Sequence, residues 1–299
     1  MVSLNLKYLT IIMTLLLSVL TANGEKRAFL VGIGDYDTRE SGWRKIHGDN
    51  DVALLSPLLE KNGFKVSSVI NRSATKSNII KGLKRLTEEC RPGDFVYFHF
   101  SGHGQPVVDC NGDEKRTYDE AIVPYDALRS EGYSPKGPPY RGENHIVDDE
   151  LAPYFHKIRK KVGATGELFI VFDACYSRGL EKGDNDFPED FDVDSIPEFM
   201  RGTADFLNPS DKSHLKSITF PNSYHSGTIM TVVSACRENE RNFELKVGEK
   251  YYGSLSYCMY TLMRKSMDFK TWREYFKSNY HLKSRCFPAI QHPTITIYE

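Results

Sequence analysis

Residues 98–104 read FHFSGHG, and residues 171–177 read VFDACYS. Each stretch is the end of an apolar run that stops at a reactive side chain, His103 in the first and Cys175 in the second. The carboxyl ends of parallel strands meet at one edge of an open α/β sheet. A thiol and an imidazole at that edge can form a nucleophile and its base, so the two stretches predict a thiol-dependent active site.

Apolar strands alternate with amphipathic helices along the chain, which predicts an α/β fold with a mostly parallel central sheet and helices on both faces. The first of these helices is expected to begin at Asp49, whose carboxylate can cap it. Residues 106–145 are rich in Gly, Pro and charge and predict a hairpin and a loop. Further strands are expected at 26–33, 64–70, 94–100, 167–172, 228–234 and 293–298, and further helices at 75–90, 148–162, 254–266 and 271–280.

Composition sets broad limits on the class of protein. The 299 residues are 40% hydrophobic and 26% charged, which is typical of a globular chain with a substantial core. The formal charge of -1 argues against nucleic acid or an anionic membrane as the main partner. No internal repeat and no clear linker divides the chain, so we expect one domain over residues 25–299.

The first residues have the pattern of a secretory signal peptide. Lys7 precedes an apolar run at 8–20, and small residues follow as far as Gly24. A short membrane anchor is the alternative, but the run is shorter than the roughly 20 apolar residues that a span requires. We therefore expect residues 1–24 to be removed near Gly24, export to the periplasm or the cell exterior, and no stable membrane insertion afterwards.

Six cysteines are spread along the chain without CxxC pairs, so neither a disulfide framework nor a zinc site is indicated. Cys236 and Cys258 lie in apolar stretches and are expected to be buried thiols. Residues 179–226 form an acidic insertion long enough to be functional or disordered. We expect this insertion to block the site in a zymogen and to be cut after Arg178, Lys182 or Arg201.

Simpler interpretations exist for each candidate catalytic residue. Cys175 could be a buried thiol and His103 a turn residue, but their matching positions after apolar strands favour catalysis. His99 is the rival base, and strand alternation makes it a packed residue instead. The backbone amides of Gly104 and Cys175 are candidate donors to a developing oxyanion.

Several stretches together resemble the caspase-fold (clan CD, peptidase C14) cysteine peptidases, nearest to the metacaspase-like and bacterial caspase-family members. The resemblance runs in the family's order from residue 26 to about residue 177, with weaker matches later. The matching stretches are 29–36, 48–52, 100–104, 119–126, 148–151, 173–177, 234–236, 252–256 and 291–293.

This resemblance implies a caspase-like sandwich with His103 and Cys175 as the catalytic dyad. The caspase signature has Gln two residues before the nucleophile, where this chain has Asp173. The resemblance places Asp51, Ser101 and Asp173 in the S1 pocket, and carboxylates there favour Arg or Lys and repel Asp. The alternative for Asp51 is a charge that complements the start of a helix.

The resemblance also implies a calcium site in some metacaspases, and its ligands would fall on Asp119, Asp148 and Asp149, with a distant Asp184. Calcium takes six to eight oxygens, which these carboxylates alone do not supply. The alternative is that Asp148 and Asp149 are first-turn helix charges. We expect the chemistry to need no cofactor, with calcium as an optional ligand.

The sequence thus predicts an exported cysteine endopeptidase that cleaves polypeptides after basic P1 residues. Two alternatives stay open at this point. One is a catalytically silent, caspase-like module that binds a protein partner. The other keeps the thiol chemistry but makes it acyl transfer or peptide ligation.

Overall fold

A computed structural model describes residues 24–108, 118–129, 140, 142–175, 227–237, 240–278, 286–288 and 291–299. A six-stranded sheet lies at its centre, in the order β11-β8-β7-β3-β1-β2, with β11 alone antiparallel to its neighbour. The predicted mostly parallel sheet is confirmed. Its strands are β1 Lys26–Gly32, β2 Phe64–Ile70, β3 Phe95–Ser101, β7 Glu167–Asp173, β8 Ile229–Ser234 and β11 Thr294–Tyr298.

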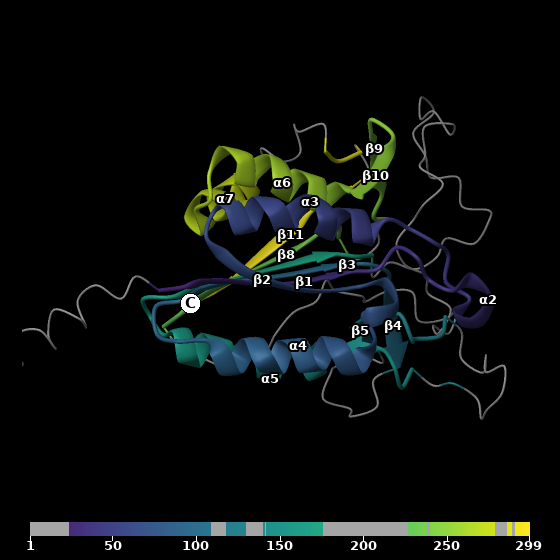
Figure 1. Ribbon diagram of the computed structural model, residues 1–299, viewed down its shortest axis with the longest axis horizontal. Helices are drawn as coiled ribbons and strands as arrows, with labels where there is room; N and C mark the ends of the chain where they lie inside the picture. Colours follow the sequence, from purple (N-terminus) through teal and green to yellow (C-terminus); the bar gives the residue numbers. More distant parts are fainter. Residues whose placement is uncertain are drawn as a thin grey trace, which may run out of the picture.

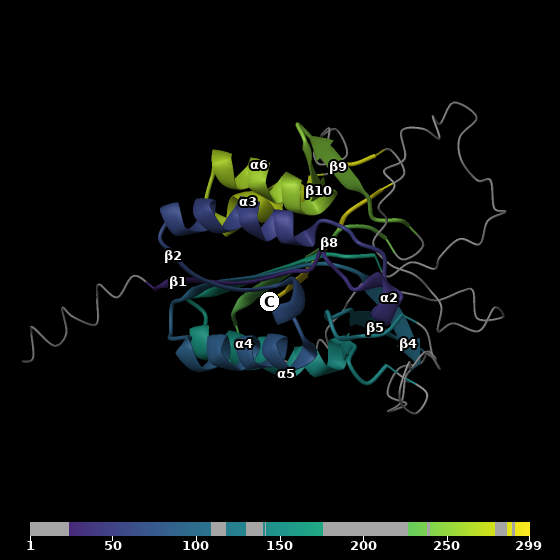
Figure 2. The ribbon, with the colours of Figure 1, turned by 45° about the vertical axis from the view of Figure 1, so that its right-hand side comes forward.

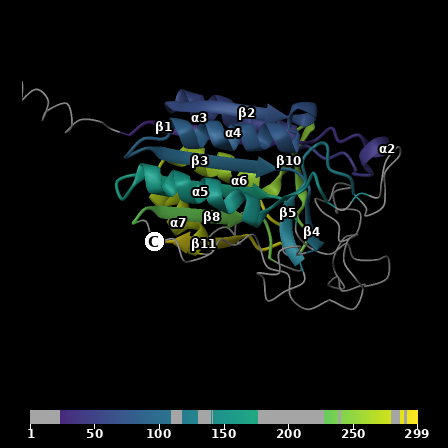
Figure 3. The same ribbon diagram turned by 90° about the horizontal axis from the view of Figure 1, so that it is seen from below.

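Helices cover both faces of this sheet, as Figure 1 shows, and Figure 3 looks onto the face under α4 and α5. One face carries α3 (Gly48–Lys61), α6 (Ser254–Lys265) and α7 (Phe269–Lys277), and the other carries α4 (Lys76–Glu89) and α5 (Asp148–Val162). Strands β1, β3 and β7 are buried on both sides because apolar residues alternate between the two helical layers. Two apolar cores result, one on each face of the sheet.

Smaller elements gather at the carboxyl end of the parallel strands (Figure 2). They are a short helix, α2 Thr38–Ser41, a sheet of β4 Gly104–Val108, β5 Tyr118–Ile122 and β6 Ile146–Val147, and a hairpin of β9 Glu244–Val247 and β10 Lys250–Gly253. A single 3-10 turn, Asn71–Ser73, follows β2. These additions surround the sheet edge at which the reactive residues were expected.

Two local expectations were wrong. Asp49 does not cap α3, which begins at Gly48 after His47 without a side-chain cap, because the Asp49 carboxylate accepts a hydrogen bond from Asn71 Nδ2 at 3.1 Å instead. The last helix begins at Phe269, two residues early, because Asp268 caps it by accepting from the Thr271 amide.

Among the described residues, no cysteine forms a disulfide, and Cys236 and Cys258 are buried as predicted. Within the part of the chain that the structure describes, no helix has the length and apolar character needed to cross a membrane.

Candidate active site

Strands β3 and β7 bring the two reactive stretches to one edge of the sheet. They pair in parallel with Ser101 opposite Asp173, and the Gly102 amide donates to the Asp173 carbonyl at 3.3 Å. His103 and Cys175 each follow their strand by two residues. The register therefore delivers the imidazole and the thiol from neighbouring strand ends, as the sequence predicted.

The His103 ring lies in an aromatic surround and is only 2% exposed. It stacks on Trp43 with ring centroids 4.8 Å apart, and the Tyr36 ring lies 4.9 Å away. Its Nε2 is 2.8 Å from the Arg44 carbonyl oxygen. Since a carbonyl only accepts, Nε2 carries the proton in the neutral ring, and Nδ1 is the nitrogen that can accept a proton from a thiol.

The aromatic surround is itself anchored to the segment after β5. Tyr36 Oη donates to the Val123 carbonyl at 2.8 Å and accepts from the His103 amide at 3.1 Å. Trp43 Nε1 donates to the Ala127 carbonyl at 3.1 Å. At Gly102, an added Cβ would lie 2.8 Å from Phe100 Cζ and 2.9 Å from Tyr36 Oη, so a larger residue would displace these rings.

The Cys175 thiol is buried, and its Sγ donates to the backbone oxygen of Glu240 at 3.3 Å. The Glu240 carboxylate in turn lies 2.6 Å from His292 Nδ1 and accepts from the His292 amide at 2.8 Å. Cys236 is a second buried thiol beside the first. A hydrogen bond with Cys175 and burial raise the pKa of the Cys236 thiol well above its ordinary value, so it remains protonated.

Asp51 and Asp173 form a pair of acidic residues that both lie against Gly253. Both carboxylates are fully buried. Asp51 accepts from Ser101 Oγ at 2.5 Å and from the Gly253 amide at 2.9 Å. A Cβ on Gly253 would clash with Asp173 Oδ2 and come within 2.9 Å of Asp51 Oδ2, which shows that both carboxylates face this glycine. The three residues that the resemblance implies for S1 thus lie together.

Neutral donors hold the Asp173 carboxylate in place. Asn242 Nδ2 donates to Oδ1 at 2.6 Å, while the Ser256 amide and hydroxyl donate to Oδ2 at 2.7 and 2.6 Å. Gln291 Nε2 supports this arrangement by donating to Asn242 Oδ1 at 2.8 Å. We did not single out Asn242 from the sequence, and the only signal for Ser256 and Gln291 was that they fall in the weaker matching stretches.

The other predicted site residues are Gly104, the candidate calcium ligands and the candidate processing sites. Gly104 starts β4 beside His103, and Asp148 and Asp149 open α5. Asp119 lies in β5 opposite Val107, and its side chain is outside the described part. Among the described side chains, no group of three His, Cys, Asp or Glu could hold a metal ion. Asp184, Arg178, Lys182 and Arg201 lie outside the described residues.

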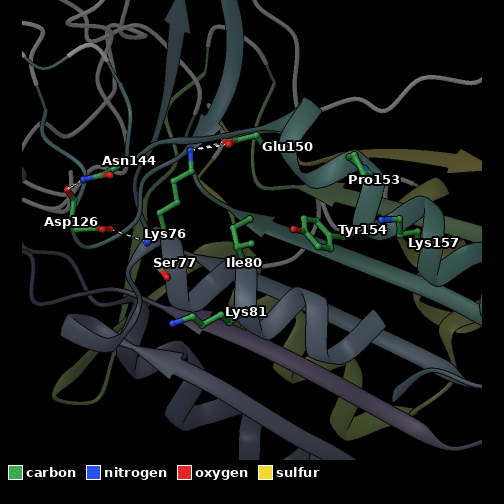
Figure 4. Close-up of a pocket in the computed structure, with 10 residues that line it drawn as sticks. All are labelled: Lys76, Ser77, Ile80, Lys81, Asp126, Asn144, Glu150, Pro153, Tyr154 and Lys157. Atoms are coloured by element: carbon green, nitrogen blue, oxygen red, sulfur yellow. Dashed lines mark hydrogen bonds and ion pairs between the residues drawn. The ribbon is translucent and has the colours of Figure 1, made fainter. Parts of the chain in front are cut away.

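A separate surface groove of about 740 Å³ lies between α4 and α5 (Figure 4). The Lys76 ammonium crosses it to the Glu150 carboxylate at 2.8 Å and donates to the His145 carbonyl at 2.7 Å. His103, Cys175, Asp51 and Asp173 are not among the residues that line it. Its described lining residues are Lys76, Ser77, Ile80, Lys81, Asp126, Asn144, Glu150, Pro153, Tyr154 and Lys157.

Two solved structures share this fold. A protein from Geobacter sulfurreducens superposes with a TM-score of 0.61 over 92% of this chain and 93% of its own, at 17% identity. Caspase-1 from Spodoptera frugiperda superposes with a TM-score of 0.50 over 91% of this chain and 88% of its own, at 14% identity. The central sheet is therefore that of a caspase-like sandwich, as expected.

Sequence comparison gives the family. Metacaspase-1 from Meyerozyma guilliermondii is 26% identical over 81% of this chain and 62% of its own length. Metacaspase-1 from Botryotinia fuckeliana is 32% identical over 52% of this chain and 35% of its own, so the chain spans less than two thirds of either relative. The family model for the metacaspase, peptidase C14 domain matches residues 26–181, just over half of the chain. The chain belongs to the metacaspase family of C14 peptidases.

Proposed function

We propose that this chain is a cysteine endopeptidase that hydrolyses peptide bonds after Arg or Lys, with Cys175 as nucleophile and His103 as general base and acid. Family membership supports the reaction class. The specificity is carried by one observation, the pair of buried carboxylates of Asp51 and Asp173 beneath Gly253. Two carboxylates side by side favour a P1 cation through charge-assisted hydrogen bonds and repel an acidic P1 side chain.

The geometry suggests a sequence of steps. His103 Nδ1 takes the Cys175 proton, which requires the thiol to leave the Glu240 carbonyl, and the thiolate attacks the scissile carbonyl carbon. The Gly104 and Cys175 amides are the proposed donors to the oxyanion. The imidazolium then protonates the leaving amine, and a water molecule deprotonated by the same ring hydrolyses the thioester.

The decisive experiment is turnover of four fluorogenic peptides that differ only at P1, with Arg, Lys, Asp or Ala, by protein lacking residues 1–24. We expect cleavage of the Arg and Lys peptides alone and none by Cys175→Ala. No turnover of any peptide, with or without calcium and even after limited proteolysis of the 179–226 segment, would contradict the proposal. A product heavier than the substrate would instead indicate peptide ligation.

Calcium binding is proposed as an option at the start of α5, where Asp148 is buried and Asp149 follows it. The described side chains give only part of a ligand set, so no catalytic step passes through the ion. Calorimetric titration of calcium should show binding to the protein that Asp148→Asn weakens. A titration without heat of binding would remove this option.

Export and maturation are proposed on the sequence alone. Mass spectrometry of the secreted protein should find an N-terminus near residue 25 and cuts after Arg178, Lys182 or Arg201. An intact Met1 would contradict the signal peptide, and active enzyme without a cut between 178 and 201 would contradict the zymogen.

A further inference from the structure

We propose that His99, in the middle of β3, is a positioning residue that orients the Ser256 hydroxyl onto Asp173 and so fixes one carboxylate of the P1 pocket. This inference rests on the proposed function, because it assigns a role to the wall behind that pocket. His99 is fully buried and therefore acts only through its neighbours.

His99 is one link in a chain of buried hydrogen bonds that ends at Asp173. Tyr97 Oη lies 2.8 Å from His99 Nδ1, and His99 Nε2 lies 2.9 Å from Ser256 Oγ. Ser256 Oγ lies 2.6 Å from Asp173 Oδ2, and the Ser256 amide also donates to that oxygen. This series of hydrogen bonds therefore joins β3 to the first turn of α6 behind the proposed P1 pocket.

Donor and acceptor counting fixes the direction of every bond. A serine hydroxyl has one hydrogen, and an ionised Asp173 can only accept, so that hydrogen points at the carboxylate. Ser256 Oγ must then accept from His99, which places the ring proton on Nε2 and leaves Nδ1 to accept from Tyr97. Burial, with a smaller contribution from the Asp173 charge, raises the pKa of Tyr97 well above its ordinary value, so the phenol keeps its hydrogen.

The surroundings of His99 indicate that its ring does more than fill space in the core. Leu30, Phe169 and Val171 lie in the same apolar core as Tyr97, on the His99 side of the sheet. A polar ring buried there is costly unless its nitrogens are bonded. Both nitrogens of His99 are bonded, and one bond leads to the pocket. Without the His99 hydrogen bond, the Ser256 hydroxyl could turn away and the carboxylate would lose an oriented donor.

The test compares His99→Leu, His99→Gln and Ser256→Ala in the mature protein. Each variant is assayed for Kd of benzamidine by calorimetry and for kcat and KM with the P1-Arg peptide. We expect His99→Leu to weaken benzamidine binding and raise KM about tenfold, equivalent to about 1.4 kcal/mol, with kcat changed less than about threefold. His99→Gln should recover most of the loss, because its amide can donate from nearly the position of Nε2.

A double-mutant cycle separates this role from a merely structural one. If His99 acts through Ser256, the double variant should bind no worse than Ser256→Ala alone. If His99→Leu does not fold, Tyr97→Phe serves instead, with about a threefold loss in the wild type and none in the Ser256→Ala background.

Unchanged Kd in the folded variants, additive losses in the cycle, or a Gln variant as weak as Leu would overturn the inference alone. Failure of the wild type to bind benzamidine and to cleave the Arg peptide would overturn the proposed function, and the inference with it.

Discussion

Replacing Asp51 by asparagine removes one carboxylate of the pocket and keeps its shape. The Asp51 carboxylate accepts from the Gly253 amide at 2.9 Å and from Ser101 Oγ at 2.5 Å. An asparagine oxygen can still accept from Gly253, and its NH2 group can donate to Ser101 once that hydroxyl rotates. The described hydrogen bonds therefore survive, and the main change is the lost charge.

The expected loss of activity in Asp51→Asn equals the contribution of the Asp51 charge to binding a P1 arginine. A hydrogen bond to a charged group contributes about 1.5–3 kcal/mol, so kcat/KM for a P1-Arg peptide should fall about 10- to 150-fold in Asp51→Asn. Citrulline has the shape of arginine without its charge. Cleavage of the matching P1-citrulline peptide should fall less than that of the arginine peptide, because the neutral N–H donors of citrulline lose a charged acceptor but no charge–charge attraction.

The assay measures kcat/KM for both peptides with the wild type, Asp51→Asn and Asp49→Asn. Asp49 is a matched control because it lies in the same turn of α3 and loses the same charge, while its carboxylate bonds to Asn71. We expect Asp49→Asn to remain within about twofold of the wild type. An equal fall for the arginine and citrulline peptides, or no fall for arginine, would refute the charge argument.

Two further predictions concern Gly253 and the buried His145. Gly253→Ala should abolish cleavage of Arg peptides, because its Cβ would clash with Asp173 and crowd Asp51; activity within tenfold of the wild type would contradict this. Burial and, to a lesser extent, the charge of Lys76 lower the pKa of His145 from 6.5 to about 3. Between these two pH values the unfolded chain binds a proton at His145 and the native protein does not. Stability should therefore fall as the pH drops below 6.5, by about 1 kcal/mol between pH 7 and pH 5.5. Urea unfolding should show a smaller drop in His145→Gln, and identical pH dependence would contradict the assignment.

The sequence predicts the sheet and the positions of His103 and Cys175 because buried parallel strands are recognised from local apolar runs. Their apolar runs end where the structure ends β3 and β7, and the residues that follow meet at one edge. The family resemblance adds Asp51 and Asp173, which no periodicity could pair, because they are brought together only by the packing of α3 against the sheet.

The donors around Asp173 could not be read from local pattern. Asn242 and Ser256 reach it across 69 and 83 residues of sequence, through a loop and a helix whose placement depends on the whole fold. The Asp49 cap failed for a related reason, since Asn71 competes for the same carboxylate from another element. Strand alternation correctly predicted that His99 is packed inside the protein, but it could not show which polar groups would bond to the ring.

The described partners of Asp51 and Asp173 bear on the specificity proposed above. A lysine or arginine bound to Asp51 or Asp173 would stabilise the buried charge and would also compete with the cation of the substrate. Hydroxyl and amide donors orient and stabilise a carboxylate without cancelling its charge. In the function proposed above, a P1 Arg or Lys would bring its positive charge to these two carboxylates, and this is the attraction that Asp51→Asn would weaken.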